Sequence, residues 1–305
     1  MSYLVCDCNN YKSAYIAILG LPNAGKSTLL NALVEKELCI TSDRPQTTRN
    51  SILGIRHSDN YQMLFLDTPG WHQGKLKIDN FFRNQVEQSI SDADLILFVI
   101  DARHPKEHKN REFLELLTKK SSKPVILVLT KIDSIKQSSL IALMQNLHSE
   151  FTKVKELIPV SAQENQNVKN LINLLLDNMQ AGPPYYPPEY FTDKSTSFLL
   201  GEFTREYLFR NLDQEVPFSC ATVIEEFDES ETRINAQISI YVERKGQKLI
   251  LLGPSGALIR EIKSKTIQKA RKFFKKKVDL QIWVKVKAKW RQDSTILSQI
   301  GYKLG

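Results

Sequence analysis

The chain has 305 residues, of which 42% are hydrophobic and 25% are charged. These values are typical of an ordinary globular protein and exclude a disordered or fibrous one. The length is roughly twice that of a usual domain and predicts two domains. No apolar run reaches the roughly 18 residues of a membrane-spanning helix, and the first residues lack the pattern of a secretory signal. We therefore expect a cytoplasmic protein.

The net charge of +8 is concentrated in one segment. From Lys245 to Arg291 there are 15 Lys or Arg against Glu261 and Asp279, a net charge of +13, which leaves −5 for the rest of the chain. This asymmetry predicts a polyanionic partner for the C-terminal part, either nucleic acid or an anionic membrane surface. A basic face that only meets water is the alternative.

The first part of the chain, up to about Asn178, alternates β-rich runs with helical stretches. This alternation is typical of an α/β fold, in which helices flank a largely parallel sheet. Ser51–Arg56 and Tyr61–Leu66 flank a short polar turn, so they are expected to form a hairpin that makes the sheet mixed. The predicted parallel strands are Tyr15–Leu19, Asp94–Ile100, Pro124–Leu129 and Glu156–Val160.

A proline-rich stretch, Ala181–Pro188, cannot continue a helix, because each proline lacks an amide hydrogen. We therefore predict a linker over residues 181–194, between a first domain of residues 1–180 and a smaller α+β domain of residues 195–305. In the smaller domain the expected order is a helix, two strands, helices and a strand. The corresponding ranges are Ser197–Asn211, Ser219–Phe227, Arg233–Glu243, Ala257–Lys276 and Asp279–Lys287.

A phosphate-binding motif, G-x-x-x-x-G-K-S, occupies residues 20–27 between a predicted strand and a predicted helix. Its glycines let backbone amides turn toward the β-phosphate, while Lys26 reaches the β and γ oxygens. The Ser27 hydroxyl is placed to bind Mg²⁺. The residues of this loop expected to bind nucleotide are Asn23, Ala24, Gly25, Lys26, Ser27 and Thr28.

The motif Asp67-Thr68-Pro69-Gly70 ends the Tyr61–Leu66 strand. At this place an aspartate can reach the Mg²⁺ shell and a glycine amide can meet the γ-phosphate. Alone, the four residues could be a simple turn. Beside the phosphate-binding motif they predict that Asp67 binds the metal and that Gly70 takes part in hydrolysis.

Two further motifs predict guanine as the base. Thr130-Lys131-Ile132-Asp133 follows a predicted strand, and the Asp133 carboxylate can accept both hydrogens that guanine, unlike adenine, offers from its ring nitrogen and its exocyclic amine. Ser161-Ala162-Gln163 follows the last strand of the first domain, where the Ala162 amide could donate to the guanine carbonyl oxygen. With the phosphate motifs, they predict a site for GTP or GDP with Mg²⁺.

These nucleotide-binding motifs, in this order along the chain, resemble those of the translation-factor-like GTPases. In that class a threonine between the first helix and the second strand senses the γ-phosphate through Mg²⁺. The corresponding loop here is Thr41–Arg49, and the resemblance implies Thr48 in this role, as metal ligand and catalytic residue, with Thr47 as the alternative.

Pro45-Gln46-Thr47-Thr48-Arg49 narrows the resemblance to the Era family of bacterial ribosome-assembly GTPases. The C-terminal half is also similar to the second domain of that family, so the resemblance covers nearly the whole chain. The segments that carry it are Thr204–Leu208, Glu215–Ser219 and Trp283–Lys287 with Trp290.

The site residues predict GTP hydrolysis in which Lys26 and Mg²⁺ neutralise developing charge, and we expect a slow intrinsic rate because of the residue at position 71. Trp71 stands where Ras-like enzymes carry a water-orienting glutamine. Asn23 resembles the asparagine that holds K⁺ in potassium-stimulated relatives, which suggests K⁺ stimulation. The resemblance implies the small ribosomal subunit as partner, through the 3′ region of 16S ribosomal RNA. The sequence gives no oligomeric state, and we expect a monomer.

Three features depart from the family pattern. Thr130 replaces the usual asparagine that ties the guanine loop to the phosphate loop, although a threonine hydroxyl could still bridge the two. Gln73-Gly74 replaces the usual Lys-Pro. Cys6 and Cys8 lie in an N-terminal extension.

The sequence Gly253-Pro254-Ser255-Gly256 places G-x-x-G between an apolar run and a helix, as in KH domains, and the element order matches the type II variant. In such a domain the glycines bring backbone against the sugar-phosphate chain, beside a groove for about four unpaired nucleotides. A plain tight turn is the alternative interpretation. The predicted RNA-binding residues are Lys248, Gly253, Pro254, Ser255, Gly256, Arg260 and Lys263.

The basic segment Lys265–Lys277 leaves a second hypothesis open. Its apolar residues could place it on anionic lipid, which would make the chain a membrane-associated signalling GTPase on the inner face of the cell membrane. A non-catalytic RNA chaperone is disfavoured by the intact nucleotide motifs. We expect Phe273, Phe274 and Trp283 to be packed in the core rather than stacked on bases.

Overall fold

The computed structural model describes residues 11–41, 51–68, 70, 77–105, 108–151 and 154–299. Contacts divide the chain into two compact units, the first made of residues 1–39 and 48–193 and the second made of residues 194–305 together with residues 40–47. The first unit is an α/β domain with a mixed sheet, and the second is a smaller α+β domain. The predicted fold class is confirmed.

The first unit is built on a six-stranded sheet in which the strands lie in the order β2-β3-β1-β4-β5-β6. All neighbours are parallel except β2 and β3, which form the predicted antiparallel hairpin. The predicted parallel strands are confirmed, with ends that differ by a few residues. The strands are β1 (Lys12–Gly20), β2 (Ile52–Ser58), β3 (Tyr61–Asp67), β4 (Leu95–Asp101), β5 (Val125–Thr130) and β6 (Glu156–Pro159).

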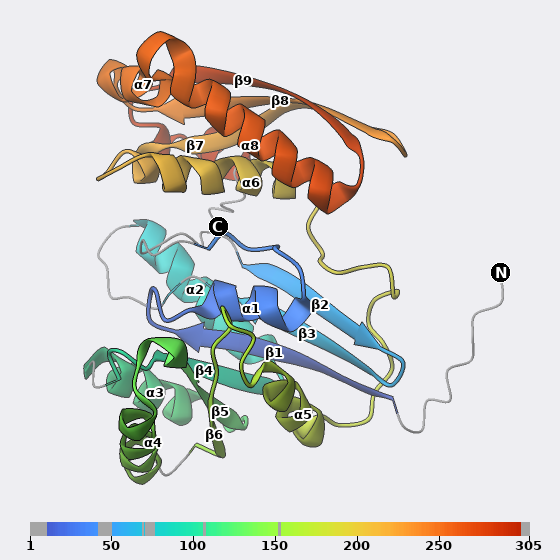
Figure 1. Cartoon of the computed structure of the whole chain (residues 1–305), viewed down its shortest axis with the longest axis vertical. Coiled ribbons are helices and arrows are strands. Elements are labelled where there is room, and N and C mark those ends of the chain that lie inside the picture. Colours follow the sequence, from blue (N-terminus) through green and yellow to red (C-terminus); the bar gives the residue numbers. More distant parts are fainter. Residues whose placement is uncertain are drawn as a thin grey trace, which may run out of the picture. The chain divides into compact units, whose positions relative to one another are not determined.

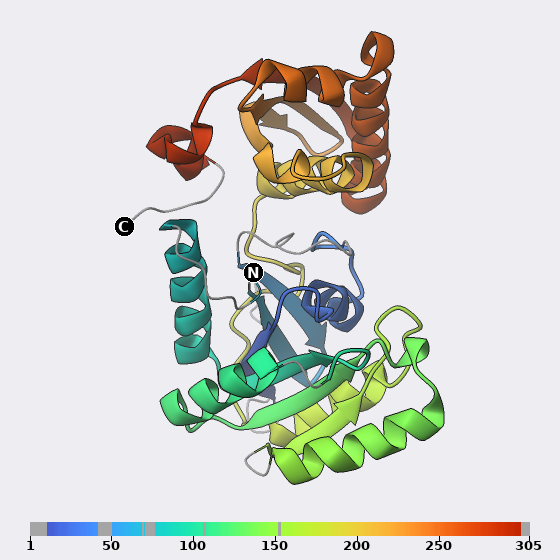
Figure 2. The same ribbon diagram turned by 90° about the vertical axis from the view of Figure 1, so that its left-hand side faces the viewer.

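Helices cover both faces of this sheet, as Figures 1 and 2 show. Parallel strands need such crossovers, because each strand must return to the same end of the sheet. The main helices of the unit are α1 (Lys26–Val34), α2 (Lys77–Asp92), α3 (His108–Lys120), α4 (Gln137–Glu150) and α5 (Val168–Asn178).

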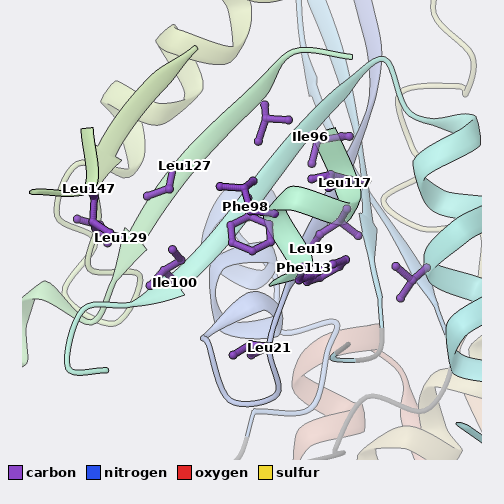
Figure 3. Close-up of a cluster of buried hydrophobic side chains, with 14 of the residues drawn as sticks. Leu19, Leu21, Ile96, Phe98, Ile100, Phe113, Leu117, Leu127, Leu129 and Leu147 are labelled. Carbon is purple, nitrogen blue, oxygen red and sulfur yellow. The ribbon is translucent and has the colours of Figure 1, made fainter. Parts of the chain in front are cut away.

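The core of the first unit fixes the strand ends that carry the motifs. Figure 3 shows Phe98 of β4 and Phe113 of α3 in this cluster, with ring centroids 5.4 Å apart in an edge-to-face arrangement. Both rings are fully buried, and burial of a phenylalanine side chain contributes about 1.5–3 kcal/mol. Because β4 and β5 are apolar on both faces and packed on both sides, their carboxyl ends have little freedom to shift.

The proline-rich segment is attached to the first unit. Gln62 of β3 is fully buried, and its Oε1 accepts hydrogen bonds from the amides of Tyr185 at 2.7 Å and Tyr186 at 3.0 Å. Its Nε2 donates to the carbonyl of Tyr186 at 2.7 Å. Further along, the amide of Ile55 donates to the carbonyl of Phe191 at 2.9 Å. The segment predicted as a linker is therefore held along the β2–β3 hairpin.

The second unit has a three-stranded sheet in the order β7-β8-β9, with β8 antiparallel to β7 and parallel to β9. Figure 1 shows α6 and α8 side by side against these strands. The observed order confirms the predicted one and resolves a separate helix, α7, before the G-x-x-G loop. The elements are α6 (Thr196–Asn211), β7 (Ala221–Glu229), β8 (Arg233–Val242), α7 (Lys245–Leu252), α8 (Ala257–Phe274), β9 (Lys277–Val286) and the short α9 (Ser294–Gln299).

The aromatic residues of the second unit divide into packed and exposed ones. The rings of Phe273 and Phe274 lie 5.2 and 5.8 Å from that of Phe203 on α6, which confirms their predicted packing. The prediction for Trp283 is wrong, because its side chain is 55% exposed. Residues alternate between the two faces of β9, and since Val284 faces the core, Trp283 must face outward.

Candidate guanine-nucleotide site and KH loop

The phosphate loop connects the end of β1 to the start of α1, and its glycines are sterically required. Gly20 has a φ of 152°, and a Cβ there would lie 2.4 Å from the carbonyl oxygen of Val99. Gly25 has a φ of 91° and directly precedes α1. Only glycine adopts such conformations without strain, so the loop keeps its amides close to the helix N-terminus, where anions bind.

Lys26 lies inside this loop rather than in solvent. Its side chain is buried, and its Nζ donates to the carbonyls of Leu21 at 2.8 Å and Gly20 at 3.1 Å. Burial lowers the pKa of Lys26 to about 8, against the opposing effect of the Asp67 carboxylate. The ammonium group is thus held at the centre of the loop, where it can exchange carbonyl contacts for phosphate oxygens.

Ser27 and Asp67 come together from motifs 40 residues apart in the chain. The Ser27 Oγ donates to Asp67 Oδ2 at 2.8 Å, and Asp67 is fully buried at the end of β3. A hydroxyl and a carboxylate at this distance match the oxygen ligands that Mg²⁺ prefers. The residues present therefore fit the predicted metal site.

Gly70 lies directly against the phosphate loop. A Cβ on Gly70 would approach the backbone nitrogen and Cα of Pro22 to 2.7 Å, so no other residue fits without a shift. The segment after Asp67 is thereby brought to the phosphate loop, where the sequence analysis expected it.

The guanine motif is organised around the Asp133 carboxylate. Its Oδ1 accepts a hydrogen bond from Ser161 Oγ at 2.5 Å, and its Oδ2 accepts one from Ser134 Oγ at 3.0 Å. The hydrogen bond from Ser161 is the main cause that lowers the pKa of Asp133. The carboxylate therefore stays ionised and oriented. Ser161 also joins the Ser161-Ala162-Gln163 motif to the guanine motif, with Ala162 half-buried and Gln163 exposed.

The guanine motif is tied to the phosphate loop by two side chains. Thr130 Oγ1 donates to the carbonyl of Ala24 at 2.6 Å, so the hydroxyl makes the bridge that the family usually obtains from asparagine. Lys131 Nζ donates to the carbonyl of Asn23 at 2.7 Å. The exposed Asn23 lies at the tip of the loop with a φ of 62°, and Thr28 is half-buried in α1.

One charged residue of this region, Asp101, belongs to none of the sequence motifs. Asp101, the last residue of β4, pairs with Lys131 at 2.9 Å. The available signal was a carboxylate at the carboxyl end of a buried parallel strand, the edge at which α/β proteins bind ligands.

Several predicted residues lie outside the described residues. They are Thr48 and its alternative Thr47, Trp71, Gln73-Gly74, Cys6 and Cys8.

The G-x-x-G loop of the second unit follows α7 and is shaped by its backbone. Gly253 and Gly256 have φ angles of 68° and 76°, and Ser255 between them also has a positive φ of 48°. A Cβ on Gly253 would meet the Leu258 Cβ at 2.9 Å. Pro254 begins a single exposed turn that ends at Gly256, so this loop presents backbone to its surroundings.

The three predicted cations differ in how they relate to this loop. Arg260 contacts it, because its Nη1 donates to the carbonyl of Ser255 at 2.7 Å. Lys263, in the second turn of α8, lines a groove of about 700 Å³ together with Ile267 and Arg271 and with residues of all three strands. Lys248 is half-buried on α7.

Comparison with known proteins gives the family. Residues 15–131 match the model of the 50S ribosome-binding GTPase family, and residues 215–291 match the KH domain model. The chain is 40% identical over 293 residues to the GTPase Era of Clostridium kluyveri, covering 96% of this chain and 99% of that protein. The chain belongs to the Era family of GTPases. Era of Lactobacillus helveticus is 36% identical over 294 residues, 96% of each chain.

Solved structures of the Era family have the same fold. The crystal structure of Era in complex with MgGDPNP and nucleotides 1506–1542 of 16S ribosomal RNA superposes with a TM-score of 0.91, at 32% identity over 96% of this chain and all of that one. A variant of Aquifex aeolicus Era bound to GDP·AlF4⁻ gives the same values. The chain is therefore a GTPase whose second unit is a KH domain.

Proposed function

We propose that this Era-family GTPase is an RNA-binding switch in assembly of the small ribosomal subunit. The first unit binds GTP or GDP with Mg²⁺, and the KH domain binds single-stranded RNA from the 3′ region of 16S ribosomal RNA. The observation that supports this most directly is the presence, in one chain, of a braced guanine-nucleotide site and an exposed G-x-x-G loop. The Era relative that holds both MgGDPNP and 16S nucleotides combines the same two ligands.

For hydrolysis, the residues of the first unit would position the γ-phosphate for in-line attack by water. Lys26 keeps its proton and donates to the β and γ oxygens, while the Gly70 amide meets the γ-phosphate. Ser27 and Asp67 would hold Mg²⁺, which neutralises phosphate charge when bound. Trp71 has no amide side chain to orient the water, so the intrinsic rate is slow and the bound nucleotide acts as a timer.

For RNA binding, the KH loop supplies close backbone contact and the groove beside α8 receives splayed bases. The surrounding cations add a field that attracts any phosphate chain without reading its sequence. The loop and its cations favour single-stranded RNA as a class of ligand, and the 16S assignment rests on similarity to the Era relative.

The membrane hypothesis loses support, because the apolar side chains of α8 that lipid would need are partly or fully buried within the protein. Ala270 is fully buried, and Phe273 and Phe274 contact Phe203. In the part of the chain that the structure describes, no helix combines the length and apolar content of a membrane span. Flotation of the protein with anionic vesicles, with and without RNA, tests the remaining weak contact.

The decisive experiment is ultraviolet crosslinking of the protein to RNA in growing cells, followed by mapping of the bound nucleotides. We expect crosslinks concentrated in the 3′ region of 16S ribosomal RNA, depleted when Gly253 and Gly256 are both replaced by aspartate. Crosslinks spread evenly over unrelated transcripts would contradict the proposal, and so would crosslinks that survive the double replacement.

The suggested role of K⁺ remains a hypothesis about Asn23. Its position at the exposed tip of the phosphate loop is compatible with an ion near the bridging phosphate oxygen. Hydrolysis measured in matched K⁺ and Na⁺ buffers, for the parent and for Asn23→Ala, decides the question. Equal hydrolysis rates in the two buffers would contradict the hypothesis of K⁺ stimulation.

A further inference from the structure

Asp101 holds a carboxylate between two cations at the edge of the nucleotide site. Its Oδ2 lies 2.7 Å from Arg103 Nη2 and 2.9 Å from Lys131 Nζ. Its Oδ1 accepts hydrogen bonds from the backbone amide and the Nε of Arg103, both at 3.0 Å. The Asp101 side chain is only 12% exposed, so these interactions are partly shielded from water.

The parallel sheet explains why Asp101 reaches the guanine motif. Asp101 is paired in register with Thr130 on the neighbouring strand β5, and the Ala102 amide donates to the Thr130 carbonyl at 3.0 Å. Both strands end at the same edge. The residue after Thr130 is Lys131, whose side chain is thus beside the Asp101 carboxylate.

Lys131 transmits this contact to the phosphate loop. Its Nζ donates to the carbonyl of Asn23 at 2.7 Å, and its Cε passes close to Gly25, where a Cβ would be in van der Waals contact at 3.7 Å. A lysine side chain released into solvent gains rotamer freedom, which disfavours a single fixed conformation. A fixed counter-charge is therefore needed if Lys131 is to stay on the loop before nucleotide binds.

We propose that Asp101 is a positioning residue for guanine-nucleotide binding, acting through Lys131. Its carboxylate anchors the Lys131 ammonium against Asn23 and so keeps the phosphate loop and the guanine motif in their binding arrangement. This inference rests on the proposed binding of GTP and GDP at this site. Burial raises the pKa of Asp101, but the hydrogen bonds from Arg103 and Lys131 outweigh it and bring the pKa to about 2. The anchor is therefore charged throughout the physiological range.

A purely structural role for Asp101 predicts a different result. In that case its replacement would lower the melting temperature but leave the affinity of the folded protein for nucleotide unchanged. A positioning role predicts lost affinity, and it predicts that the loss depends on Lys131.

The test is a double-mutant cycle on the full chain, read out by the affinity and dissociation rate of fluorescent GDP. We expect Asp101→Asn to weaken GDP binding roughly tenfold, the size expected for one hydrogen bond to a charged group. In a Lys131→Met background the same replacement should have no further effect. An equal loss in both backgrounds, or no loss in the parent, overturns the proposal.

Asp94→Asn is the matched control. It removes a carboxylate directly before β4, at the opposite edge of the sheet, where Asp94 Oδ2 accepts from the Tyr15 amide. It should leave GDP affinity unchanged. If Asp101→Asn does not fold, Asp101→Glu, which keeps the charge on a longer side chain, enters the same cycle with the same criterion. Parent protein that fails to bind GDP would instead refute the proposed function itself.

Discussion

The two loops expected to meet phosphate groups in this chain are held in opposite ways. The phosphate loop of the first unit is braced by side chains from elsewhere in the sheet, since Thr130 and Lys131 both donate to its carbonyls. The G-x-x-G loop is exposed and owes its shape to positive φ angles, with Arg260 as its side-chain brace. A compact ligand that must be positioned for chemistry favours a preorganised site. A polymer that is bound by many weak contacts needs mainly close access to the backbone.

The largest expected effect concerns base recognition in the braced site. Asp133→Asn should reduce GTP affinity by roughly a thousandfold. The two guanine donors would then lose the carboxylate that accepts them, and buried polar groups left without partners cost much binding energy. The replacement should also create a preference for xanthine nucleotides, since the amide offers a donor where the carboxylate only accepts. Competition binding with GTP and XTP measures both changes.

Ser134→Ala is the control for this prediction, because it removes one hydrogen bond to Asp133 and keeps the carboxylate. It should leave the preference for guanine unchanged. Tight GTP binding by Asp133→Asn, without gain for XTP, would refute the guanine assignment.

The next largest effect concerns close access to the backbone of the exposed G-x-x-G loop. Replacing Gly253 and Gly256 with aspartate should weaken RNA binding by roughly a hundredfold or more, because side chains block the approach of phosphate and the added carboxylates repel it. GTP affinity should not change. Salt-titrated RNA binding beside GTP titration gives both quantities.

Gly246→Asp provides a matched control within the same domain. Gly246 lies in the first turn of α7, and a Cβ there would meet nothing within 4 Å. An acidic residue is also favourable near a helix N-terminus. If this variant loses as much RNA affinity as the double aspartate variant, added charge rather than loop shape is responsible, and the KH interpretation of Gly253–Gly256 fails.

A third prediction concerns the contribution of the Asp101 charge to the stability of the first unit. The folded-state pKa of Asp101 is about 2, below its ordinary value of 3.8, so its stabilising contribution is present above pH 4 and is lost as the pH falls toward 2. At pH 7, Asp101→Asn should therefore be less stable than the parent by up to about 2 kcal/mol.

The difference in unfolding free energy between parent and Asp101→Asn should shrink as the pH is lowered from 4 to 2. Urea unfolding followed by circular dichroism measures it, and hydrogen exchange of the β4 and β5 amides assigns it to the first unit. A difference that stays constant across this pH range would mean that the charge of Asp101 contributes nothing.

Much of the first unit could be predicted from sequence, because its motifs bind nucleotide only when particular strands and helices flank them. A Gly-Lys-Ser sequence at residues 25–27 works only between a strand and a helix, and apolar runs such as Leu95–Ile100 are typical of buried parallel strands. What remained hidden depends on register between strands. The contact of Asp101 with Lys131 exists because Asp101 and Thr130 are paired, and no local pattern encodes that pairing.

Trp283 and Gln62 illustrate two further limits. Trp283 and Val284 are both apolar, so the sequence alone does not say which of them faces the core of a strand whose register is unknown. Gln62 interrupts an apolar strand and would ordinarily be placed in solvent. Its burial follows from the backbone groups of Tyr185 and Tyr186, which lie more than 120 residues away and satisfy its amide.

The smallest expected effect tests whether the basic surface of the KH domain acts only through charge. Lys275 and Lys277 are exposed, and neither forms an ion pair with the described residues. The adjacent Lys276 is paired with Glu229 Oε1 and donates to the carbonyl of Ser230, both at 2.8 Å. Replacing Lys275 and Lys277 with glutamine should flatten the dependence of log affinity on log salt by at most about 0.7 for each RNA phosphate that the two lysines neutralise in the parent.

The preference of the protein for one RNA sequence over another should not change in that variant, because phosphate contacts carry no base information. Lys276→Gln is the internal control, since its charge is already balanced by Glu229 and it should leave the slope close to that of the parent. RNA titrations at four or more salt concentrations separate these outcomes. An unchanged slope in the double variant would mean that Lys275 and Lys277 only meet water, whereas an equal change in Lys276→Gln would mean that the ion pair with Glu229 does not withhold this lysine from RNA.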